Sequence, residues 1–235
     1  GLKRKIVKIA NNASLIMPVS LDLQHCMEGH GVKNRFKVIY NLVNTDIFKL
    51  GEPHQADKKR MLHISTLRDE AKNFSGILRT IEKLRQQRDD FELHVIHDYE
   101  APEFKQFVKE HNLTDCVFFH GKKTSAEVAQ AYQQADFFVL FSNFENLPCV
   151  IVEAFASGIP VLSTSVGGIA EILSPERGIL INAGDETALL QGMNTMLDHC
   201  QEYNREAIRD YAVRTFAAQY IGQQIYESYQ QVTKE

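Results

Sequence analysis

Short apolar runs alternate with amphipathic stretches from residue 60 to residue 200. The apolar runs have the length of buried strands, and they are MLHIS (61–65), FELHVIH (91–97), CVFFHG (116–121), DFFVLFS (136–142), IPVLST (159–164) and RGILIN (177–182). Between them, apolar residues recur at helical spacing, which predicts helices over 74–88, 101–112, 124–135, 147–158, 167–173 and 185–200. Strands that alternate with helices are typical of a parallel sheet covered on both faces, so we predict an α/β, doubly wound fold.

The first fifty residues follow a different pattern. The segments SLIMPVS (14–20) and FKVIYNLV (36–43) are strand-like, and SLDLQHCMEGHG (20–31) between them predicts a helix with Ser20 as its N-cap. The polar stretch GEPHQADKKR (51–60) predicts a linker to the alternating region. Two further helical stretches end the chain.

Composition narrows the class of protein. Apolar residues make up 44% and charged residues 24% of the 235 residues, and the net charge of -4 argues against a nucleic-acid partner bound through a broad basic surface. The longest apolar run, 147–162, is too short and too interrupted to span a membrane. Four widely separated cysteines without C-x2-C spacing indicate reduced thiols and a cytoplasmic location. Because the chain opens on Gly1 rather than Met, we expect it to be a piece of a longer protein.

Two glutamates stand out in FENLPCVIVEAFASG, namely Glu145 and Glu153. Glu153 lies in a nearly unbroken apolar run, where an unpaired carboxylate costs several kcal/mol. It therefore pairs with a buried Arg or Lys, reaches the helix surface, or serves a ligand. Asn146 is the expected N-cap of this helix and Pro148 lies in its first turn, which leaves free N–H groups suited to a phosphate. Glu153 would lie about 9 Å along the helix axis, so the two carboxylates could contact different parts of an extended ligand.

A second loop between a strand and a helix, SVGGIAE, contains two adjacent glycines. Gly167 and Gly168 permit close approach of the backbone to an anion, although they could also serve only to form a turn. Glu171 follows three residues later and could stabilise the start of its own helix.

The stretch ENLPCVIVEAFASGIPVLSTSVGGIAEIL resembles the nucleotide-sugar half of family 4 (group 1) retaining glycosyltransferases. The family's Glu-x7-Glu motif falls on Glu145 and Glu153, and the elements EAFASGIPV and GGIAE follow in order. VIYNLVNTDIF resembles the family's hinge motif, although Leu42 stands where Gly is usual, and HISTLRDEAKNFSGIL resembles its diphosphate-binding loop. The likeness covers nearly the whole chain.

This resemblance implies the C-terminal half of a GT-B fold, with a Rossmann-like sheet. Residues 1–50 would be the tail of an N-terminal domain and the hinge, and 51–215 the nucleotide-sugar-binding domain. Residues 216–235 would form a C-terminal helix that packs back toward the N-terminal domain.

The resemblance also implies roles for particular residues. Glu153 would accept hydrogen bonds from the ribose hydroxyls of the donor, which explains a carboxylate in an apolar run. Glu145 would lie beside the donor sugar near its reacting carbon, and Lys72 would neutralise the diphosphate leaving group. The backbone that follows Glu145 would contact sugar hydroxyls and phosphate, and it comprises Asn146, Leu147 and Pro148.

Two departures from the family pattern concern the same site. The usual Gly/Ser-Arg-Leu motif reads Ser-Thr-Leu at 65–67, so Thr66 holds the arginine's place, and Arg68 either substitutes for it or is solvated. Residues 97–98 are His-Asp where family members often have a Gly-x-Gly turn. Base contacts would come from the loop that carries Lys122.

The implied reaction transfers a sugar from a UDP- or GDP-sugar to a glycan or lipid-linked acceptor with retention at the anomeric carbon. Lys72 and helix N-termini would stabilise the departing diphosphate, so we expect no metal and no other cofactor. We expect the isolated chain to bind donor without transfer, and peripheral membrane association of a full-length enzyme is compatible with the family. Two alternatives stay open: a non-catalytic nucleotide-sugar-binding module, and a GT-B-related epimerase or phosphorylase.

Overall fold

Six parallel strands form one sheet in a computed structural model that describes residues 2–52, 56–98 and 100–233. The strands are β1 (Lys59–Ser65), β2 (Phe91–His97), β3 (Val117–Gly121), β4 (Phe137–Leu140), β5 (Val161–Thr164) and β6 (Gly178–Ile181). Their order is β3-β2-β1-β4-β5-β6, and every pair is parallel. This is the strand order of a Rossmann-like sheet, so the predicted doubly wound α/β fold is confirmed.

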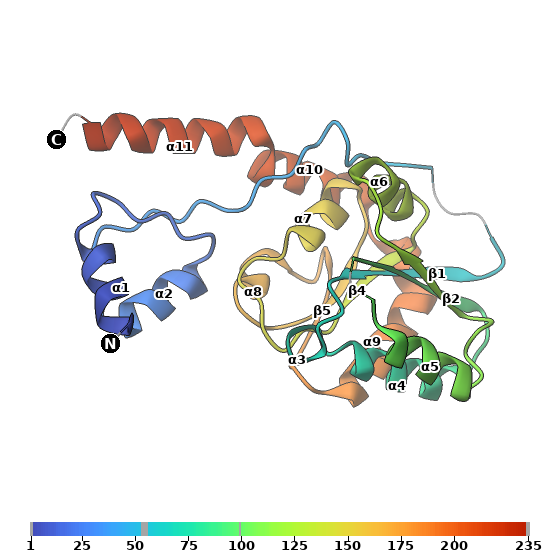
Figure 1. Ribbon diagram of the computed structural model, residues 1–235. Helices are drawn as coiled ribbons and strands as arrows, with labels where there is room; N and C mark the ends of the chain where they lie inside the picture. Colours follow the sequence, from blue (N-terminus) through green and yellow to red (C-terminus); the bar gives the residue numbers. More distant parts are fainter. Residues whose placement is uncertain (1, 53–55, 99, 234–235) are drawn as a thin grey trace.

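Helices cover both faces of the sheet (Figure 1). The lower face in that view is covered by α4 (Phe74–Arg85), α5 (Pro102–Glu110) and α9 (Glu186–His199), and the upper face by α6 (Ser125–Gln133), α7 (Cys149–Ala156) and α10 (Arg205–Phe216). On β4, Phe137 and Val139 belong to the lower core, whereas Phe138 and Leu140 belong to the upper one. Successive side chains of a strand point to opposite faces of the sheet, so a sheet covered by helices on both faces has one hydrophobic core on each face.

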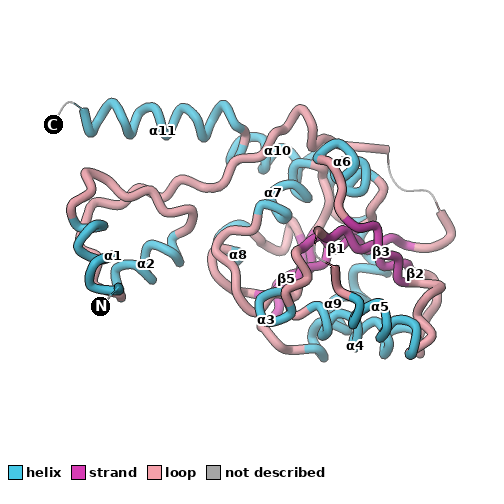
Figure 2. Tube along the Cα trace, in the orientation of Figure 1, coloured by secondary structure: helices cyan, strands magenta, loops and turns pink. Residues whose placement is uncertain are grey.

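The short helices α3 (Asp69–Lys72), α8 (Ile169–Ile172) and the 3-10 helix η1 (Cys200–Glu202) lie in connections. Beside the α/β body lie α1 (Leu2–Asn11) and α2 (Leu21–Gly29), which long loops join to β1 (Figures 1 and 2). The last helix, α11 (Ala218–Thr233), extends over this N-terminal part, and the Lys37 Nζ donates to the Gln224 carbonyl at 3.3 Å. The predicted boundary between the domain and the C-terminal helix, at residues 215 and 216, lies at the end of α10, and α11 begins at Ala218.

The N-terminal part differs from its prediction in two respects and agrees with it in one. Segments 14–20 and 36–43 are not strands: Ile16 and Phe36 form an isolated parallel bridge, and within the described residues no named strand lies beside them to extend it. Residues 2–11 form α1, for which we predicted no element. The predicted helix N-cap is confirmed, because the Ser20 hydroxyl accepts from the Leu23 N–H at 3.0 Å.

The linker prediction over 51–60 is partly wrong. Its last two residues, Lys59 and Arg60, belong to β1, because the Arg60 N–H donates to the Asp136 carboxylate at 2.7 Å and the Lys59 N–H to the Asp90 carbonyl at 2.8 Å. Residues 53–55 lie outside the described part of the chain.

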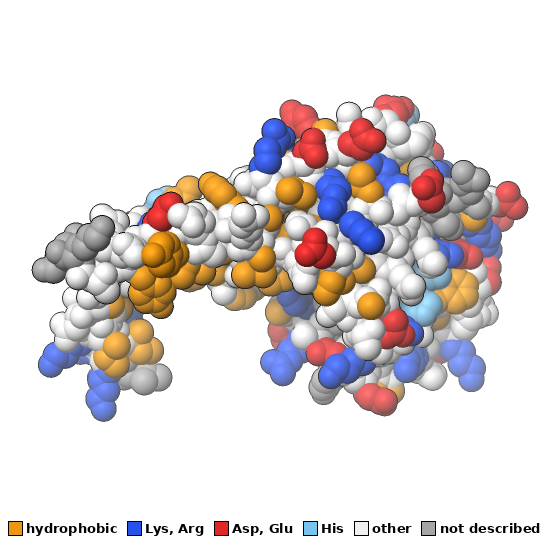
Figure 3. Space-filling model, turned by 90° about the horizontal axis from the view of Figure 1, so that it is seen from above, with side chains coloured by type: hydrophobic (Ala, Val, Ile, Leu, Met, Phe, Trp, Pro, Cys, Tyr) orange, Lys and Arg blue, Asp and Glu red, His pale blue; other side chains and the backbone are white. Residues whose placement is uncertain are grey.

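Hydrophobic side chains gather over the arm that α11 and the N-terminal part form (Figure 3). Tyr226 of α11 is 59% exposed.

Gly178 fixes the edge pairing of the sheet. It starts β6 with φ of +151°, opposite Val161 of β5. A Cβ at this position would lie 1.8 Å from the Val161 carbonyl oxygen, so only glycine fits without movement of the backbone.

We therefore expect Gly178→Ala to lower the free energy of unfolding by at least about 2 kcal/mol, because it adds a backbone clash to an unfavourable φ. Gly222→Ala is the matched control, since a Cβ at Gly222 in α11 would meet nothing within 4 Å. The control should be neutral or stabilising by up to about 1 kcal/mol. Urea unfolding of both variants, followed by circular dichroism, measures the difference. Equal effects would contradict this account.

Candidate functional site

Two connections leave the carboxyl edge of the sheet in opposite directions. β1 continues into α3 and α4 on the lower face, whereas its neighbour β4 continues into α7 on the upper face. Pairing between the two strands ends at Leu62 and Phe138. In open α/β sheets, ligands bind where neighbouring connections diverge in this way.

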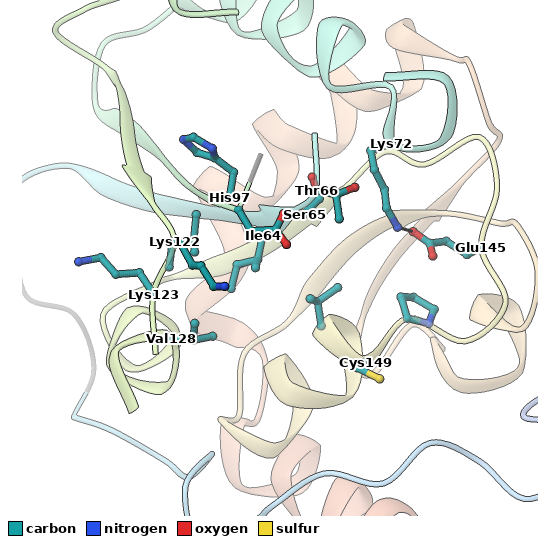
Figure 4. Close-up of a pocket in the computed structure, with 14 residues that line it drawn as sticks. Ile64, Ser65, Thr66, Lys72, His97, Lys122, Lys123, Val128, Glu145 and Cys149 are labelled. Carbon is teal, nitrogen blue, oxygen red and sulfur yellow. Dashed lines mark hydrogen bonds and ion pairs between the residues drawn. The ribbon is translucent and has the colours of Figure 1, made fainter. Parts of the chain in front are cut away.

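A cavity of about 460 Å³ lies at this divergence (Figure 4). Apolar side chains line part of it, and these are Ile64, Ile96, Val128 and Val150. Its polar side chains come from the loops after β1, β2, β3 and β4, and they include Thr66, Lys72, Asp98, Lys122 and Glu145. A cavity of this size with apolar walls and a few polar groups is typical of a small-molecule site.

Five of the residues predicted from sequence line this cavity, and they are Thr66, Lys72, Lys122, Glu145 and Pro148. The other six do not line it, and they are Arg68, Asn146, Leu147, Glu153, Gly167 and Gly168. Residues 97–98, which we noted as a departure from the family pattern, also line it. Their roles toward a ligand stay predictions; their positions are described below.

Lys72 and Glu145 both line the cavity and point toward each other, and a dashed line marks their ion pair (Figure 4). The Lys72 Nζ lies 2.5 Å from the Glu145 Oε1, and the Ser142 hydroxyl donates to the same oxygen at 2.7 Å. Both side chains are largely covered, with 20% of Lys72 and 9% of Glu145 exposed. No protein donor to the Glu145 Oε2 is found among the described residues, so this oxygen is available to a ligand.

The loop after β1 is tied to the loop after β4. The Asn143 N–H donates to the Ala71 carbonyl at 2.8 Å, and the Asp69 carboxylate accepts from the Ser75 N–H at 2.8 Å. Asn73 turns the chain through the left-handed region, with φ of +46°, between α3 and α4. These contacts hold Lys72 at the end of α3, where its side chain reaches the opposite loop.

The structure places Thr66 and Arg68 differently. Thr66 is exposed and lines the cavity, in the position where the family pattern has arginine. Arg68 is the N-cap residue of α3 and is also exposed, but it lies outside the cavity lining. Arg68 is therefore not brought into the cavity in this conformation.

The predicted N-cap at Asn146 is wrong. The helix α7 begins at Cys149 with Pro148 as its N-cap, and no side chain caps it. The Asn146 carbonyl accepts from the Gly168 N–H at 2.6 Å, and the Leu147 carbonyl accepts from the Asn41 side-chain amide at 2.7 Å. Because these carbonyls bind other segments, the helix starts later, and Glu153 lies about 6 Å along its axis rather than 9 Å.

Glu153 lies one turn into α7 beyond the cavity-lining Cys149 and is half-buried. Burial raises the pKa of its carboxyl, and a hydrogen bond from Tyr132 offsets part of this rise. That bond is long: the Tyr132 hydroxyl lies 2.7 Å from the Val150 carbonyl but 3.4 Å from the Glu153 Oε2. Within the described part of the chain we find no ion pair for Glu153, so the alternative of a buried pair with Arg or Lys is not observed.

The two glycines approach protein backbone. Gly167 has φ of +55°, and a Cβ on it would lie 2.1 Å from the Glu145 carbonyl oxygen. A Cβ on Gly168 would lie 2.6 Å from the Ser20 Cβ. The glycines thus let three segments meet behind Glu145, whereas an anion contact at Gly167 and Gly168 stays a prediction.

Glu171 caps a distant helix, which sequence analysis missed. Its two carboxylate oxygens accept from the Leu21 and Asp22 N–H groups, each at 2.9 Å, at the N-terminus of α2. A carboxylate is favoured there by the free N–H groups and the helix dipole. The sequence relates Glu171 to the GGIAE motif of the family and to the start of its own helix, because no local signal connects positions 150 residues apart.

The described residues provide neither a candidate metal site nor a candidate membrane-spanning helix. They contain no group of three or more His, Cys, Asp or Glu side chains that could hold a metal ion. None of the helices described in the structure is both long enough and apolar enough to cross a membrane.

The fold and the cavity define a Rossmann-like domain with a ligand site at the divergence of β1 and β4. The family model for glycosyl transferases of group 1 matches residues 58–199. This match covers more than half of the 235 residues. The chain therefore belongs to the group 1 glycosyltransferase family.

Two curated relatives match different shares of this chain. An uncharacterized 41.2 kDa protein in the cps region of Klebsiella pneumoniae is 26% identical over 236 residues, which cover 94% of this chain and 63% of the relative. N-acetyl-alpha-D-glucosaminyl L-malate synthase of Bacillus anthracis is 29% identical over 165 residues, which cover 65% of this chain and 42% of the relative. The chain thus spans only part of the length of these proteins.

Solved structures share the fold. Anabaena Alr3699/HepE in complex with UDP-glucose aligns with a TM-score of 0.85 at 22% identity, over 97% of this chain and 67% of that one. Sucrose-phosphate synthase from Thermosynechococcus elongatus aligns with a TM-score of 0.86 at 21% identity, over 99% of this chain and 61% of that one. At such identities the likeness establishes the architecture.

We expect Glu171→Ala to lower the free energy of unfolding by about 1–2 kcal/mol, because α2 loses its capping carboxylate. Amide hydrogen exchange at Leu21 and Asp22 should accelerate in the same variant. Glu176→Ala is the control, since Glu176 is exposed and bonded to nearby Ser174, and it should change stability by less than about 0.5 kcal/mol. Unchanged exchange at Leu21 would show that Glu171 does not cap α2 in solution.

Proposed function

We propose that this chain binds a nucleotide-sugar donor as part of a retaining, family 4 glycosyltransferase. The observation that carries this is the pair of Lys72 and Glu145 at the cavity, with one carboxylate oxygen left for a ligand. A cation for a phosphate and a carboxylate for sugar hydroxyls are the two groups that a sugar diphosphate needs side by side. Membership in the glycosyltransferase family supports the same donor class.

The donor has one arrangement that matches these groups. Its diphosphate lies against Lys72 and the Thr66 hydroxyl, and its sugar contacts the Glu145 Oε2. The nucleoside lies over the apolar wall near Val128 and Lys122, with its ribose hydroxyls toward Glu153. That Alr3699/HepE was solved with UDP-glucose supports a UDP-sugar, and GDP remains the second base to test.

In the proposed reaction, Lys72 stabilises the negative charge of the diphosphate leaving group. Departure of the diphosphate from the anomeric carbon builds negative charge beside Lys72, which then binds the phosphate oxygens in place of Glu145. A lysine released from an ion pair in this way can stabilise the leaving group without a metal ion, and this metal independence is part of the proposal. Transfer with retention, to a glycan or lipid-linked acceptor, would require the full-length protein.

A second candidate is a nucleotide-sugar-binding module that does not catalyse transfer. It is favoured by one observation: the arginine position holds Thr66, and Arg68 lies outside the cavity. The loss of one phosphate-binding cation would weaken stabilisation of the leaving group more than binding of the nucleoside.

We also propose a cytoplasmic location, which the free cysteines support, and peripheral membrane association of the full-length protein.

We expect Glu153→Ala to cost about 1.5–3 kcal/mol of nucleotide affinity, because ribose hydroxyls lose a charged acceptor. Calorimetric titration with UDP, GDP, ADP and CDP identifies the preferred base and then measures the loss. Glu110→Ala is the control, because Glu110 is exposed at the end of α5 on the opposite face of the sheet. Binding of no nucleotide by the unaltered chain, or equal binding by Glu153→Ala, would refute the proposal.

We further expect the isolated chain to bind its donor without transferring the sugar. The acceptor site and part of the cleft would belong to the remainder of a longer enzyme, since this chain spans 42–63% of the two relatives above. Release of UDP from UDP-glucose, measured with and without oligosaccharide acceptors, tests this. Turnover by the isolated chain would contradict the expectation, and turnover by the full-length protein separates an enzyme from a binding module.

A further inference from the structure

His63 lies on β1 at the point where β1 and β4 separate. Pairing of the two strands ends one residue earlier, at Leu62. The His63 Nδ1 lies 2.9 Å from the Val139 carbonyl oxygen of β4, so the imidazole bonds to the carbonyl just beyond the last paired residue. The ring is fully buried, and its other nitrogen, Nε2, lies 2.8 Å from the Ser65 hydroxyl.

These contacts determine where the hydrogens lie. A carbonyl oxygen can only accept, so the His63 Nδ1 carries the hydrogen. Burial lowers the pKa of His63 to about 4, so the ring is neutral at pH 7 and its Nε2 can only accept. The Ser65 hydroxyl must therefore donate its single hydrogen to the His63 Nε2.

Ser65 in turn holds the loop that follows. Its hydroxyl oxygen accepts from the Leu67 N–H at 3.0 Å. Leu67 is buried and has φ of +55°, a left-handed conformation that a leucine adopts only when its surroundings enforce it. Between the two, Thr66 is turned outward and lines the cavity.

We propose that His63 is a positioning residue for the diphosphate end of the donor site. Through Ser65 it fixes the turn at 65–67, so that Thr66 and not Ser65 offers a hydroxyl hydrogen to the ligand. Ser65 also lines the cavity, but its hydrogen is committed to His63. The part that concerns the ligand rests on the proposed function, whereas the effect on the turn does not.

A purely apolar role for His63 would predict something different. The ring lies 5.1 Å from the Phe74 ring, between centroids, and phenylalanine could preserve this packing. Phenylalanine cannot donate to Val139 or accept from Ser65. His63→Phe therefore separates packing from positioning.

The first test uses the chain without ligand. In the imidazole nitrogen–proton spectrum, assigned by the signals lost in His63→Phe, His63 should be protonated on Nδ1 alone at pH 7. In His63→Phe and Ser65→Ala, amide exchange at Leu67 should accelerate at least about tenfold, as expected when a local hydrogen bond is lost. Protonation on Nε2, or unchanged exchange at Leu67 in both variants, overturns the proposal whether or not a nucleotide binds.

The second test measures UDP binding calorimetrically for His63→Phe, Ser65→Ala and the double variant. We expect each single change to weaken binding about fivefold to tenfold, and the double variant to bind no more weakly than Ser65→Ala, because both act through one hydroxyl. Additive losses, or wild-type affinity in His63→Phe, overturn the positioning of the ligand.

His94→Phe is the matched control for this experiment. His94 lies on the neighbouring strand β2, is half-buried and bonds to Glu92 and His120, and it does not line the cavity. It should bind UDP as the unaltered chain does. If His63→Phe does not fold, Ser65→Ala at the cavity edge tests the same link. If the unaltered chain binds no nucleotide, the proposed function fails, and the exchange at Leu67 still decides the role of His63.

Discussion

The divergence of β1 and β4 is the constraint on which the site depends. Two neighbouring strands send their connections to opposite faces, and this leaves a cavity that neither connection fills. The same divergence leaves Val139 beyond the last pair between β1 and β4, and the His63 side chain binds its carbonyl there. The fold therefore provides the cavity and, in the same place, a buried backbone carbonyl that needs a hydrogen-bond donor.

The sequence was sufficient for the parallel sheet because burial imposes a pattern on each element. β4 and β5 are buried at every residue; β4 is a continuous apolar run, and β5 begins on Val161 and Leu162. The helix α4 shows apolar spacing over Phe74, Ile77 and Leu78. The same reasoning failed at 14–20 and 36–43. The two segments do bond to each other, since the Lys37 N–H donates to the Ile16 carbonyl and the Ile39 N–H to the Pro18 carbonyl, but the pairing is limited to an isolated bridge. The apolar pattern does not state how far such a pairing extends.

For the site, the sequence identified groups that lie on one loop each, such as Lys72, Lys122 and Glu145, all of which line the cavity. It failed where a group acts across the chain. Glu171 binds the start of α2, and the carbonyl of Asn146 binds Gly168, so the expected cap at Asn146 gave way to tertiary contacts. Local propensity is a weak guide wherever a distant segment competes for the same backbone group.

Partial burial destabilises the ionised carboxylate of Glu153. Its folded pKa is raised by burial, so the folded state holds this proton more tightly than the unfolded chain does. The free energy of unfolding therefore falls as the pH rises through the interval between the unfolded and the folded pKa, and the deficit remains at neutral pH. The Tyr132 hydroxyl compensates little, because its shorter bond goes to Val150.

This cost and the loop contacts lead to one physical account of the site. Glu153 is half-buried and has no cation partner among the described residues, so hydroxyl donors of the proposed ligand would offset the cost of its partial burial. At the other end, the Gly168 N–H donates to the Asn146 carbonyl next to Glu145, and Gly168 lies close to Ser20 beside the helix that Glu171 caps. The N-terminal part also contacts this backbone directly, because the Asn41 side-chain amide donates to the Leu147 carbonyl, although none of the described residues before Ile64 lines the cavity.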